Sequence, residues 1–365
     1  MELKFDISKT YAFALEGGGA RGAYQAGALK ALNEHGVKFN AVAGTSVGAL
    51  NGALVAMRDF ALAEETWNNM DFSRVLKVDA RAMQTMFSQG ILELEVKNIK
   101  QGIKAFFRDK GVDASPLKTL IKENIDPRRV KGSDVRLFIS TFSITDRKAL
   151  DLDAQKLGDD ELCDMLMASA YLPVFKNDPL GGKRYADGGV TNVIPISPLV
   201  KEGYTDIIAI RINGPGVERR VKLPEGTTVT ELAPKSDLGN ILNFSKSHCR
   251  RLFRLGYYDA VKMLFGLYGE KYYIDRTLSE EQAFNILYKM LILNDEFKDQ
   301  SLRAQHKELL RFCREYSSKG DYYDVLVGYL EEQAKELNLP VFKFVTDVEL
   351  MAQIGIILTP DITER

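Results

Sequence analysis

Short apolar runs alternate with segments of helical periodicity through the first two thirds of the chain. The apolar runs lie at 10–17, 39–46, 135–144 and 206–212, and helical patterns cover 22–35 and Val47 to about Met57. Such alternation is typical of a mostly parallel sheet covered by helices on both faces. The sequence therefore predicts an α/β domain built as a three-layer α/β/α sandwich.

The pattern changes after a loop at 213–240 that contains glycine, proline and one short strand. Beyond this loop, residues 240–265 and about 279–338 have helical periodicity and many charged side chains. We therefore expect the α/β domain to occupy residues 8–235 and a mainly helical C-terminal extension to occupy residues 236–365.

The segment 62–134, between the second and third apolar runs, also has helical patterns. One helix is predicted to begin at Ser115, because a hydroxyl cap followed by a proline, here Pro116, is a common helix start. Residues 80–115 read as a lid-like region.

Charge, cysteine usage and hydropathy exclude several classes of protein. A net charge of −1 creates no overall field that would attract nucleic acid. The cysteines, Cys163, Cys249 and Cys313, are far apart and lack CxxC spacing, so we expect free thiols and no zinc site. No stretch reaches the roughly 18 uncharged apolar residues of a spanning helix, and no secretion signal is visible. We expect a cytoplasmic protein that meets any membrane from one side.

A glycine-rich turn follows the first apolar run. Gly17, Gly19 and Gly22 fit the G-x-G-x-x-G pattern of dinucleotide-binding folds. Such folds end their second strand in an acidic residue, but the run at 39–46 has none there. A P-loop would close its glycines with Gly-Lys-Ser or Gly-Lys-Thr, and this turn does not. A nucleotide-dependent oxidoreductase is therefore the least favoured function.

The second apolar run leads into GTSVG at 44–48, a G-x-S-x-G motif. In such an elbow the flanking glycines allow a tight strand-to-helix turn that leaves the Ser46 oxygen exposed above the sheet. A serine that attacks an acyl carbon creates an oxyanion, which needs backbone N–H donors nearby. The glycines at 17–22 can supply these donors, because a backbone without side chains can approach the substrate closely.

The histidines do not supply an obvious base for this serine. Hydrolases with the same elbow usually carry an acid and then a histidine later in the chain. His35 ends the first predicted helix beside Gly36, where we expect it to cap the helix. His248 and His306 lie on charged helices of the extension, away from any strand end.

Asp187 is the candidate base. It follows a strand-like RYA and precedes Gly188 and Gly189, which allow a close approach to Ser46. An aspartate with a normal pKa of roughly 4 is a weak base, so it helps only if it touches the serine directly. A plain Asp-Gly-Gly turn is the alternative. A base without histidine also predicts that no essential group titrates with a pKa near 6.5.

Three motifs, GGGARG at 17–22, GTSVG at 44–48 and DGG at 187–189, occur in an order and at separations that resemble the patatin-like phospholipases. ASAYLPVF at 168–175 resembles a further segment of that family, and the resemblance covers residues 10–235. It implies a three-layer α/β/α domain that hydrolyses lipid acyl esters with a Ser–Asp dyad and without a metal or other cofactor.

The resemblance also implies a role for each residue of the motifs. Ser46 would be the nucleophile, and Asp187 would accept its proton and later activate water. Arg21 would orient the glycine turn or meet a lipid phosphate, of which we favour the first. The oxyanion hole would be formed by Gly17, Gly18, Gly19, Ala20, Arg21 and Gly22, and the elbow and dyad would be supported by Gly44, Gly48, Gly188 and Gly189.

The extension contains no recognisable catalytic motif. A basic stripe near its start consists of Lys246, Arg250, Arg251, Arg254 and Lys262. This stripe could meet an anionic membrane surface, although a helix packed on the domain with a solvated basic edge is favoured. The expected partner is a lipid or phospholipid ester. A regulated lipid-binding or signalling module, with gated or absent hydrolase activity, is the alternative function. The oligomeric state stays open.

Overall fold

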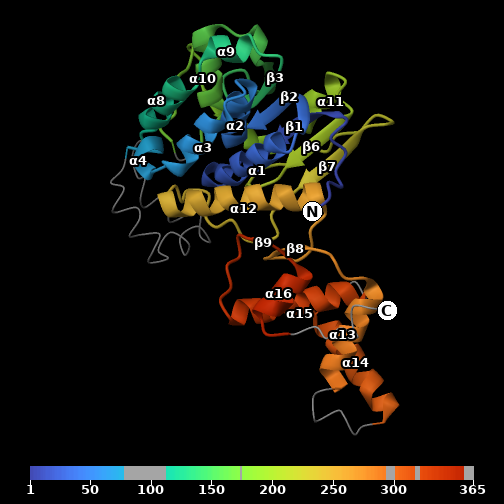
Figure 1. Cartoon of the computed structure of the whole chain (residues 1–365). Helices are drawn as coiled ribbons and strands as arrows, with labels where there is room; N and C mark the ends of the chain where they lie inside the picture. The colour runs from blue at the N-terminus through green and yellow to red at the C-terminus, as the bar shows by residue number, and fades with distance from the viewer. Residues whose placement is uncertain (78–111, 173–174, 293–300, 317–320, 357–365) are drawn as a thin grey trace. The chain divides into compact units, whose positions relative to one another are not determined.

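The computed structural model describes residues 1–77, 112–172, 175–292, 301–316 and 321–356 (Figure 1). These residues form two compact units. The larger unit comprises Asp6–Val261, and the smaller unit combines Met1–Phe5 with the chain from Lys262 on. The break falls inside helix α12 (Lys246–Phe265), later than the domain boundary at 235–236 that the sequence led us to expect.

The larger unit is built on one sheet. Within the described residues seven strands form this sheet in the order β4-β3-β2-β1-β6-β7, with β5 also paired to β3. The neighbouring strands β3, β2, β1, β6 and β7 are parallel to one another. Strands β4 and β5 are antiparallel to β3. The predicted mostly parallel sheet is therefore confirmed. The strands are β1 (Thr10–Leu15), β2 (Lys38–Thr45), β3 (Arg136–Ser143), β4 (Lys148–Asp153), β5 (Tyr185–Asp187), β6 (Asp206–Ile210) and β7 (Thr228–Leu232).

Helices cover both faces of the sheet (Figure 1). Gly52 of α2 lies against Val42 of β2, while Leu199 of α11 clusters with Ala41 and Ala43 of the same strand. Successive side chains of a strand point to opposite faces, so α2 and α11 form the outer layers of the predicted α/β/α sandwich. The helices are α1 (Gly22–Glu34), α2 (Val47–Ala56), α3 (Phe60–Asn68), α4 (Phe72–Val75), α8 (Ser115–Asn124), α9 (Pro127–Lys131), α10 (Asp159–Ser169) and α11 (Ile196–Lys201).

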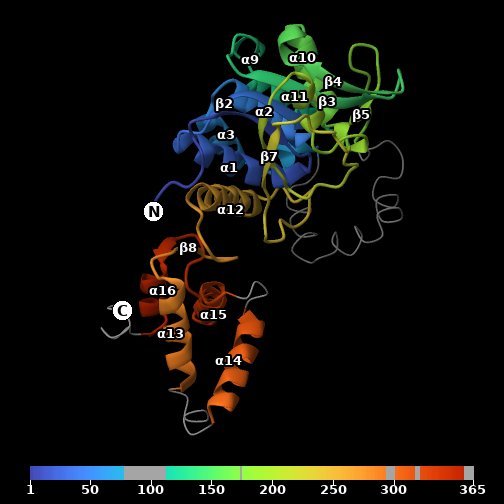
Figure 2. The ribbon, with the colours of Figure 1, turned by 90° about the vertical axis from the view of Figure 1, so that its right-hand side faces the viewer.

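Helix α12 begins in the larger unit and lies along α1 in both views (Figures 1 and 2). Glycines make the close approach possible. A Cβ atom at Gly27 would lie 1.9 Å from the Phe253 carbonyl oxygen, and one at Gly256 would lie 1.8 Å from the Tyr24 carbonyl oxygen. Because this packing extends past residue 235, the first part of α12 belongs to the α/β unit.

The start of α8 differs in detail from the prediction. Ser115 is the first helical residue and Pro116 follows it, but the Ser115 hydroxyl does not cap the helix. Instead, the Ser115 N–H donates to Asp113 Oδ1 at 2.8 Å. The predicted hydroxyl cap is therefore wrong, because a carboxylate two residues earlier takes the N–H. The lid-like region 80–115 lies mostly outside the described residues.

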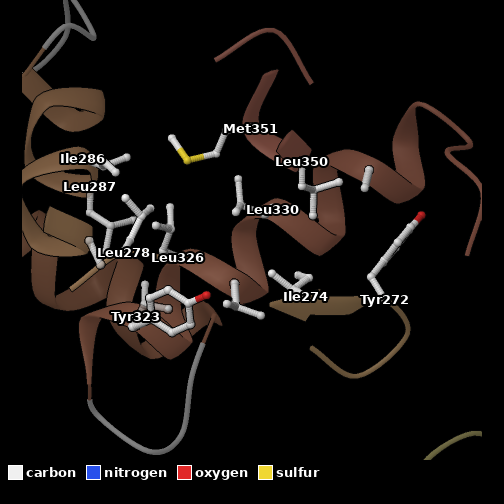
Figure 3. Close-up of a cluster of buried hydrophobic side chains, with 14 of the residues drawn as sticks. Tyr272, Ile274, Leu278, Ile286, Leu287, Tyr323, Leu326, Leu330, Leu350 and Met351 are labelled. Atoms are coloured by element: carbon white, nitrogen blue, oxygen red, sulfur yellow. The ribbon is translucent and has the colours of Figure 1, made fainter. Parts of the chain in front are cut away.

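The smaller unit is mainly helical and has its own core (Figures 2 and 3). Two short parallel strands, β8 and β9, join its helices, which the sequence did not lead us to expect. The buried Asp347 carboxylate accepts hydrogen bonds from the Tyr323 hydroxyl and from the Leu278 N–H. The elements are α13 (Glu280–Ile292), α14 (Leu302–Tyr316), α15 (Tyr322–Glu336), α16 (Asp347–Gln353), β8 (Tyr273–Asp275) and β9 (Phe344–Thr346).

The remaining expectations on membranes and thiols concern the chain as a whole. Among the described residues, no helix combines the length and apolar character needed to cross a membrane. Cys163, Cys249 and Cys313 all carry free thiols, as predicted.

Candidate active site

Ser46 occupies the turn between β2 and α2. Its backbone has φ 56° and ψ −126°, a conformation that a residue with a side chain rarely adopts. The glycines on either side allow this turn: a Cβ at Gly44 would lie 2.2 Å from the Gly48 carbonyl oxygen, and one at Gly48 would lie 2.3 Å from the Leu15 carbonyl oxygen. The strained serine and its tight turn have the form of a nucleophile elbow.

Asp187 reaches the same end of the sheet from β5, whose Asp187 pairs with Thr141 of β3. Gly188 packs closely here, because a Cβ on it would lie 2.3 Å from the Ser140 carbonyl oxygen and 3.0 Å from the Thr45 methyl carbon. The Gly189 N–H donates to Asp187 Oδ1 at 2.7 Å. The Asp-Gly-Gly turn therefore lies against the residue that precedes Ser46.

The environment of Asp187 changes its expected chemistry. Its residue is only 6% exposed, and this burial raises the pKa of Asp187 from 3.8 to about 6. The Ser46 hydroxyl and the Gly189 N–H oppose the rise by hydrogen bonding to the carboxylate. Asp187 therefore does not have the normal aspartate pKa of roughly 4 that the sequence argument considered. A pKa near that of histidine also means that a pH profile alone cannot distinguish the two kinds of base.

The contact between Ser46 and Asp187 is loose. Asp187 Oδ2 is buried, and no group in the described part of the chain makes a hydrogen bond of ordinary length and angle to it. The Ser46 hydroxyl is nonetheless close enough to lower the pKa of the carboxylate. Catalytic hydrogen bonds are often long or poorly aligned before the substrate binds, so Oδ2 is the atom available to the serine proton.

The glycine turn lies directly beside the serine, since a Cβ at Gly17 would lie 3.2 Å from Ser46 Cβ. Most N–H groups of this turn already have acceptors. Those of Gly17 and Ala20 donate to the carbonyls of Val193 and Ile241 at 2.9 and 2.8 Å, and those of Arg21 and Gly22 donate within the turn. The described residues offer no acceptor to the N–H groups of Gly18 and Gly19. These two amides are therefore the best candidates for oxyanion donors.

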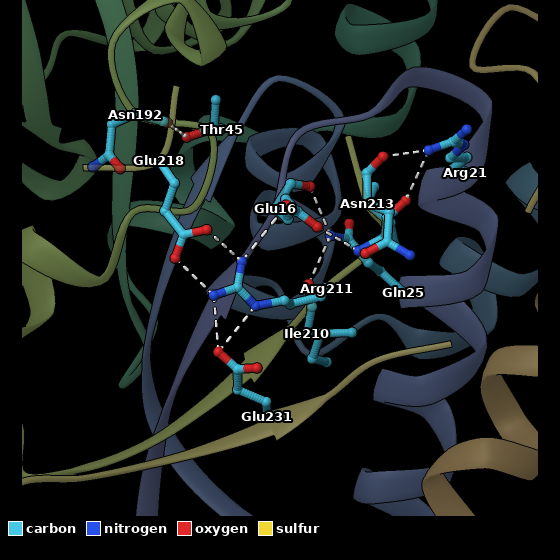
Figure 4. A network of polar contacts seen from close by, with 11 residues as sticks. Glu16, Arg21, Gln25, Thr45, Asn192, Ile210, Arg211, Asn213, Glu218 and Glu231 are labelled. Carbon is cyan, nitrogen blue, oxygen red and sulfur yellow. Dashed lines mark hydrogen bonds and ion pairs between the residues drawn. The ribbon is translucent and has the colours of Figure 1, made fainter. Parts of the chain in front are cut away.

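Arg21 holds neighbouring loops in place (Figure 4). Its guanidinium donates to the carbonyl oxygens of Gly239 at 2.8 Å and Ile212 at 3.2 Å, and also to that of Asn213. Burial lowers the pKa of Arg21. Because the guanidinium donates to three backbone carbonyls, it holds these loops in place. This supports the loop-orienting role of Arg21 over contact with a lipid phosphate.

Comparison with known proteins identifies the family. The model of the patatin-like phospholipases matches residues 13–200, which include the glycine turn, the elbow and Asp187. The chain belongs to the patatin-like phospholipase family.

Relatives of this patatin-like chain are much longer proteins. A patatin-like phospholipase domain-containing protein of Caenorhabditis elegans is 30% identical over 198 residues, which is 53% of this chain and 13% of that protein. Patatin-like phospholipase domain-containing protein 7 of Mus musculus is 31% identical over 208 residues, which is 55% of this chain and 13% of that protein. The chain thus spans about an eighth of the length of these relatives.

Two further matches are more limited. A lysophospholipase of Aspergillus terreus is 50% identical over 48 residues, or 13% of this chain and 3% of that protein. The crystal structure of VipD from Legionella pneumophila is 15% identical with a TM-score of 0.42, covering 97% of this chain and 81% of that one. A TM-score this low adds nothing to the family assignment.

Ser169 and Asn192 of the patatin-like domain hold Ser46 and its neighbour Thr45 in place, and the sequence did not predict either role. The Ser46 N–H donates to Ser169 Oγ at 2.8 Å, and the Ser169 hydroxyl donates to the Ser140 carbonyl at 2.7 Å. The Thr45 hydroxyl donates to the Asn192 carbonyl at 2.9 Å. Ser169 lies in the family-like segment 168–175, but nothing in the sequence indicates that it reaches Ser46.

A second buried carboxylate, that of Glu16, lies directly before the glycine turn and holds it to a neighbouring loop (Figure 4). Glu16 accepts the Ile212 N–H and lies near Arg211, whose guanidinium is paired with Glu218 and Glu231. Burial raises the pKa of Glu16, and these donors oppose the rise. Its hydrogen bond to Ile212 N–H ties the end of β1 to the loop that Arg21 also binds.

The histidines lie where the sequence suggested. His35 caps the C-terminus of α1. The His248 ring packs against Gly239, and burial together with the nearby Arg251 lowers its pKa to about 4. His306 belongs to α14 of the smaller unit. In the described residues, neither Ser46 nor Asp187 makes a hydrogen bond to a histidine, and no three His, Cys, Asp or Glu side chains lie together in a way that could hold a metal ion.

Proposed function

We propose that this chain is a lipid acyl hydrolase of the phospholipase A type that works through a Ser46–Asp187 dyad. Family membership supports a lipid ester hydrolase. The observation that carries the proposal is the approach of two distant segments: a strained serine, and a buried carboxylate whose pKa that serine lowers. The unoccupied N–H groups of Gly18 and Gly19 beside the serine support the same reading.

The reaction begins when Asp187 accepts the Ser46 hydroxyl proton as Oγ attacks the ester carbonyl carbon. The resulting oxyanion is stabilised by the N–H groups of the glycine turn, each worth about 3 to 4 kcal/mol of barrier. The alcohol or lysolipid leaves with the proton from Asp187, and Ser46 stays acylated. Asp187 then takes a proton from water, the hydroxide attacks the acyl-enzyme, and the proton returns to Ser46 as the fatty acid departs.

The test uses mass spectrometry of lipid products and fluorophosphonate labelling. Wild-type protein is expected to release fatty acid from a mixed phospholipid extract and to be labelled at Ser46. Ser46→Ala should lose both properties, and Asp187→Asn should lose turnover. The matched control is His306→Ala, which alters an ionisable side chain in the other unit and should retain both. Labelling without turnover would favour the gated module, and an unlabelled wild type would favour a lipid binder without catalysis.

We also propose that the larger unit meets anionic membranes from the cytoplasmic side through α12. Lys246, Arg250, Arg251 and Arg254 are exposed on one face of this helix. Lys262 does not belong with them, because its ammonium donates to the Gly269 carbonyl. Leu252, Phe253 and Leu255 are buried, so the attraction would be electrostatic without insertion of apolar side chains.

The position of this basic face favours a role near the candidate active site. The Ala20 N–H of the glycine turn donates to the Ile241 carbonyl, five residues before α12 begins. The Arg250 guanidinium donates to the Asn68 carbonyl at the end of α3. Charges along this edge would hold the site close to a phospholipid surface.

A further inference from the structure

Two buried side-chain amides, those of Gln25 on α1 and Asn51 on α2, hold both ends of the glycine turn 17–22. Gln25 Nε2 donates to the carbonyl oxygen of Glu16, directly before the turn, at 2.7 Å (Figure 4). Asn51 Nδ2 donates to the carbonyl oxygen of Gly22, the last residue of the turn, at 2.9 Å. Gln25 is 0% exposed and Asn51 is 2% exposed, so water does not compete for these bonds. The turn is therefore fixed at its beginning and at its end.

The two amides also bind each other, and Trp67 sets their direction. Asn51 Nδ2 donates to Gln25 Oε1 at 3.1 Å, and Asn51 Oδ1 accepts the Trp67 indole N–H at 2.9 Å. An indole nitrogen can only donate, so it fixes which end of the Asn51 amide faces the turn. The other Nε2 proton of Gln25 goes to the Ile210 carbonyl at 3.3 Å, so both amides use all their donors. A buried polar network whose members are all satisfied is rigid.

These bonds connect the glycine turn with the helix that carries the proposed nucleophile. Asn51 belongs to α2, and Ser46 is the N-cap of the same helix. An oxyanion donor is effective only within about 2.7–3.1 Å of the developing charge, and an error of about 1 Å can cost about 100-fold in rate. The distance between Ser46 and the N–H groups of Gly18 and Gly19 therefore matters for the reaction, and the two amides control it.

We propose that Gln25 and Asn51 are positioning residues for the oxyanion donors of the glycine turn. They fix the N–H groups of Gly18 and Gly19 at the distance from Ser46 that an oxyanion requires. The inference rests on the proposed function, because the oxyanion forms only when the serine attacks an ester. Both amides are buried with their donors used, so neither touches the substrate. Loss of either amide should slow the chemical step and leave substrate binding nearly unchanged.

The test compares a short-chain ester with its thionoester, in which sulfur replaces the carbonyl oxygen. Sulfur is a weak hydrogen-bond acceptor, so the thionoester gains little from oxyanion donors. In Gln25→Met and Asn51→Leu, kcat for the ester should fall about 10- to 100-fold with little change in KM. The thionoester should lose much less, so the ratio of the two kcat/KM values should fall about tenfold or more. This ratio does not depend on the fraction of folded enzyme, because both substrates are measured on one preparation.

The matched control is Thr66→Val, next to Trp67 on α3. The buried Thr66 hydroxyl donates to Asn124 Oδ1 on α8 at 3.3 Å and not to the turn. Its loss should lower stability but leave the ester-to-thionoester ratio unchanged. A ratio that does not change in Gln25→Met and Asn51→Leu, or that falls equally in Thr66→Val, overturns the proposal. Should Asn51→Leu fail to fold, Asn51→Ser removes the reach of the amide without adding bulk and carries the same expectation.

Hydrogen exchange separates this proposal from the proposed function, because it needs no turnover. The N–H groups of Gly17 and Ala20 are hydrogen-bonded, so a peptide covering the turn should exchange slowly in the wild type. Gln25→Met and Asn51→Leu should speed this exchange about tenfold or more, and the control should not. An inactive wild type with this pattern refutes hydrolysis and keeps the positioning role. An active enzyme whose ratio and exchange both stay unchanged in the variants keeps hydrolysis and refutes the positioning role.

Discussion

At the scale of single residues, burial decides what the candidate site can do. Nothing in the sequence around Asp187 indicates an unusual pKa. Burial nevertheless raises the pKa of Asp187 to about 6, which makes its carboxylate a better base at neutral pH. Ser46 is likewise held in a backbone conformation that its own sequence disfavours. The neighbouring Gly44 and Gly48 allow that turn, and the Ser169 hydroxyl, 123 residues away, accepts the Ser46 N–H.

The raised pKa of Asp187 has a cost in stability. Because the folded protein holds this proton more tightly than the unfolded chain, the free energy of unfolding should fall as the pH rises from about 4 to 6. Asp187→Asn removes the effect. Urea unfolding at pH 8 and pH 4 measures the free energy of unfolding of Asp187→Asn minus that of wild type. We expect this difference to be about 2 to 3 kcal/mol larger, in favour of the variant, at pH 8 than at pH 4. A pH-independent difference would refute the raised pKa.

Ser169 is expected to position the nucleophile without touching the substrate. Ser169→Ala removes the acceptor of the Ser46 N–H, and a lost buried partner costs about 1 to 3 kcal/mol. We expect kcat for a short-chain ester to fall about tenfold or more with little change in KM. Ser169→Thr keeps the hydroxyl and should recover much of the rate, whereas equal losses in both variants would argue for general disruption.

At the scale of elements, the strands and helices nearest the site followed from the sequence. The predicted run at 39–46 and the helix from Val47 correspond to β2 and α2 within one or two residues. Local patterns sufficed there because each element is regular and the GTSVG motif marks the turn between them. By contrast, β4 is half exposed at the sheet edge, and its pairing with β3 depends on contacts that a local pattern does not encode.

Helix packing also depends on single glycines that no local pattern explains. Gly256→Ala would force a methyl group to within 1.8 Å of the Tyr24 carbonyl and push α12 away from α1. We expect a loss of about 1 to 3 kcal/mol in the free energy of unfolding, measured in urea. The comparison is Gly158→Ala, where the nearest atom is 3.8 Å away and φ is −65°. Equal effects of the two changes would show that the close helix contact does not matter.

At the scale of the whole molecule, the features that the sequence did not predict are contacts between residues far apart in the chain. Motif order predicted that the Ser46 and Asp187 segments meet, but not that Ser169 would bind the Ser46 N–H from 123 residues away. The extension was expected to be mainly helical, and the sequence did not predict the pairing of β8 with β9 because each strand has only three residues. Such short pairs are specified by the surrounding core and not by their own composition.

The charged face of α12 predicts how the whole protein partitions between water and membranes. Vesicles containing phosphatidylglycerol should bind it at low salt and release it at high salt, while phosphatidylcholine vesicles should not bind it. Neutralising Lys246 and Arg251 to glutamine should weaken binding about 30-fold, at about 1 kcal/mol per charge. Neutralising Lys38 and Lys148, exposed elsewhere, makes the same change in net charge and should have little effect.

The central claim, that a buried carboxylate replaces histidine as the base, is tested most directly by the pH dependence of kcat/KM in a histidine-free protein. The chain has three histidines, so His35→Gln, His248→Gln and His306→Gln remove every imidazole. We predict that the variant keeps its activity and that kcat/KM still rises with pH around a pKa of about 6. A rise that disappears with the histidines, or one that moves to the pKa of an exposed aspartate, would contradict the account.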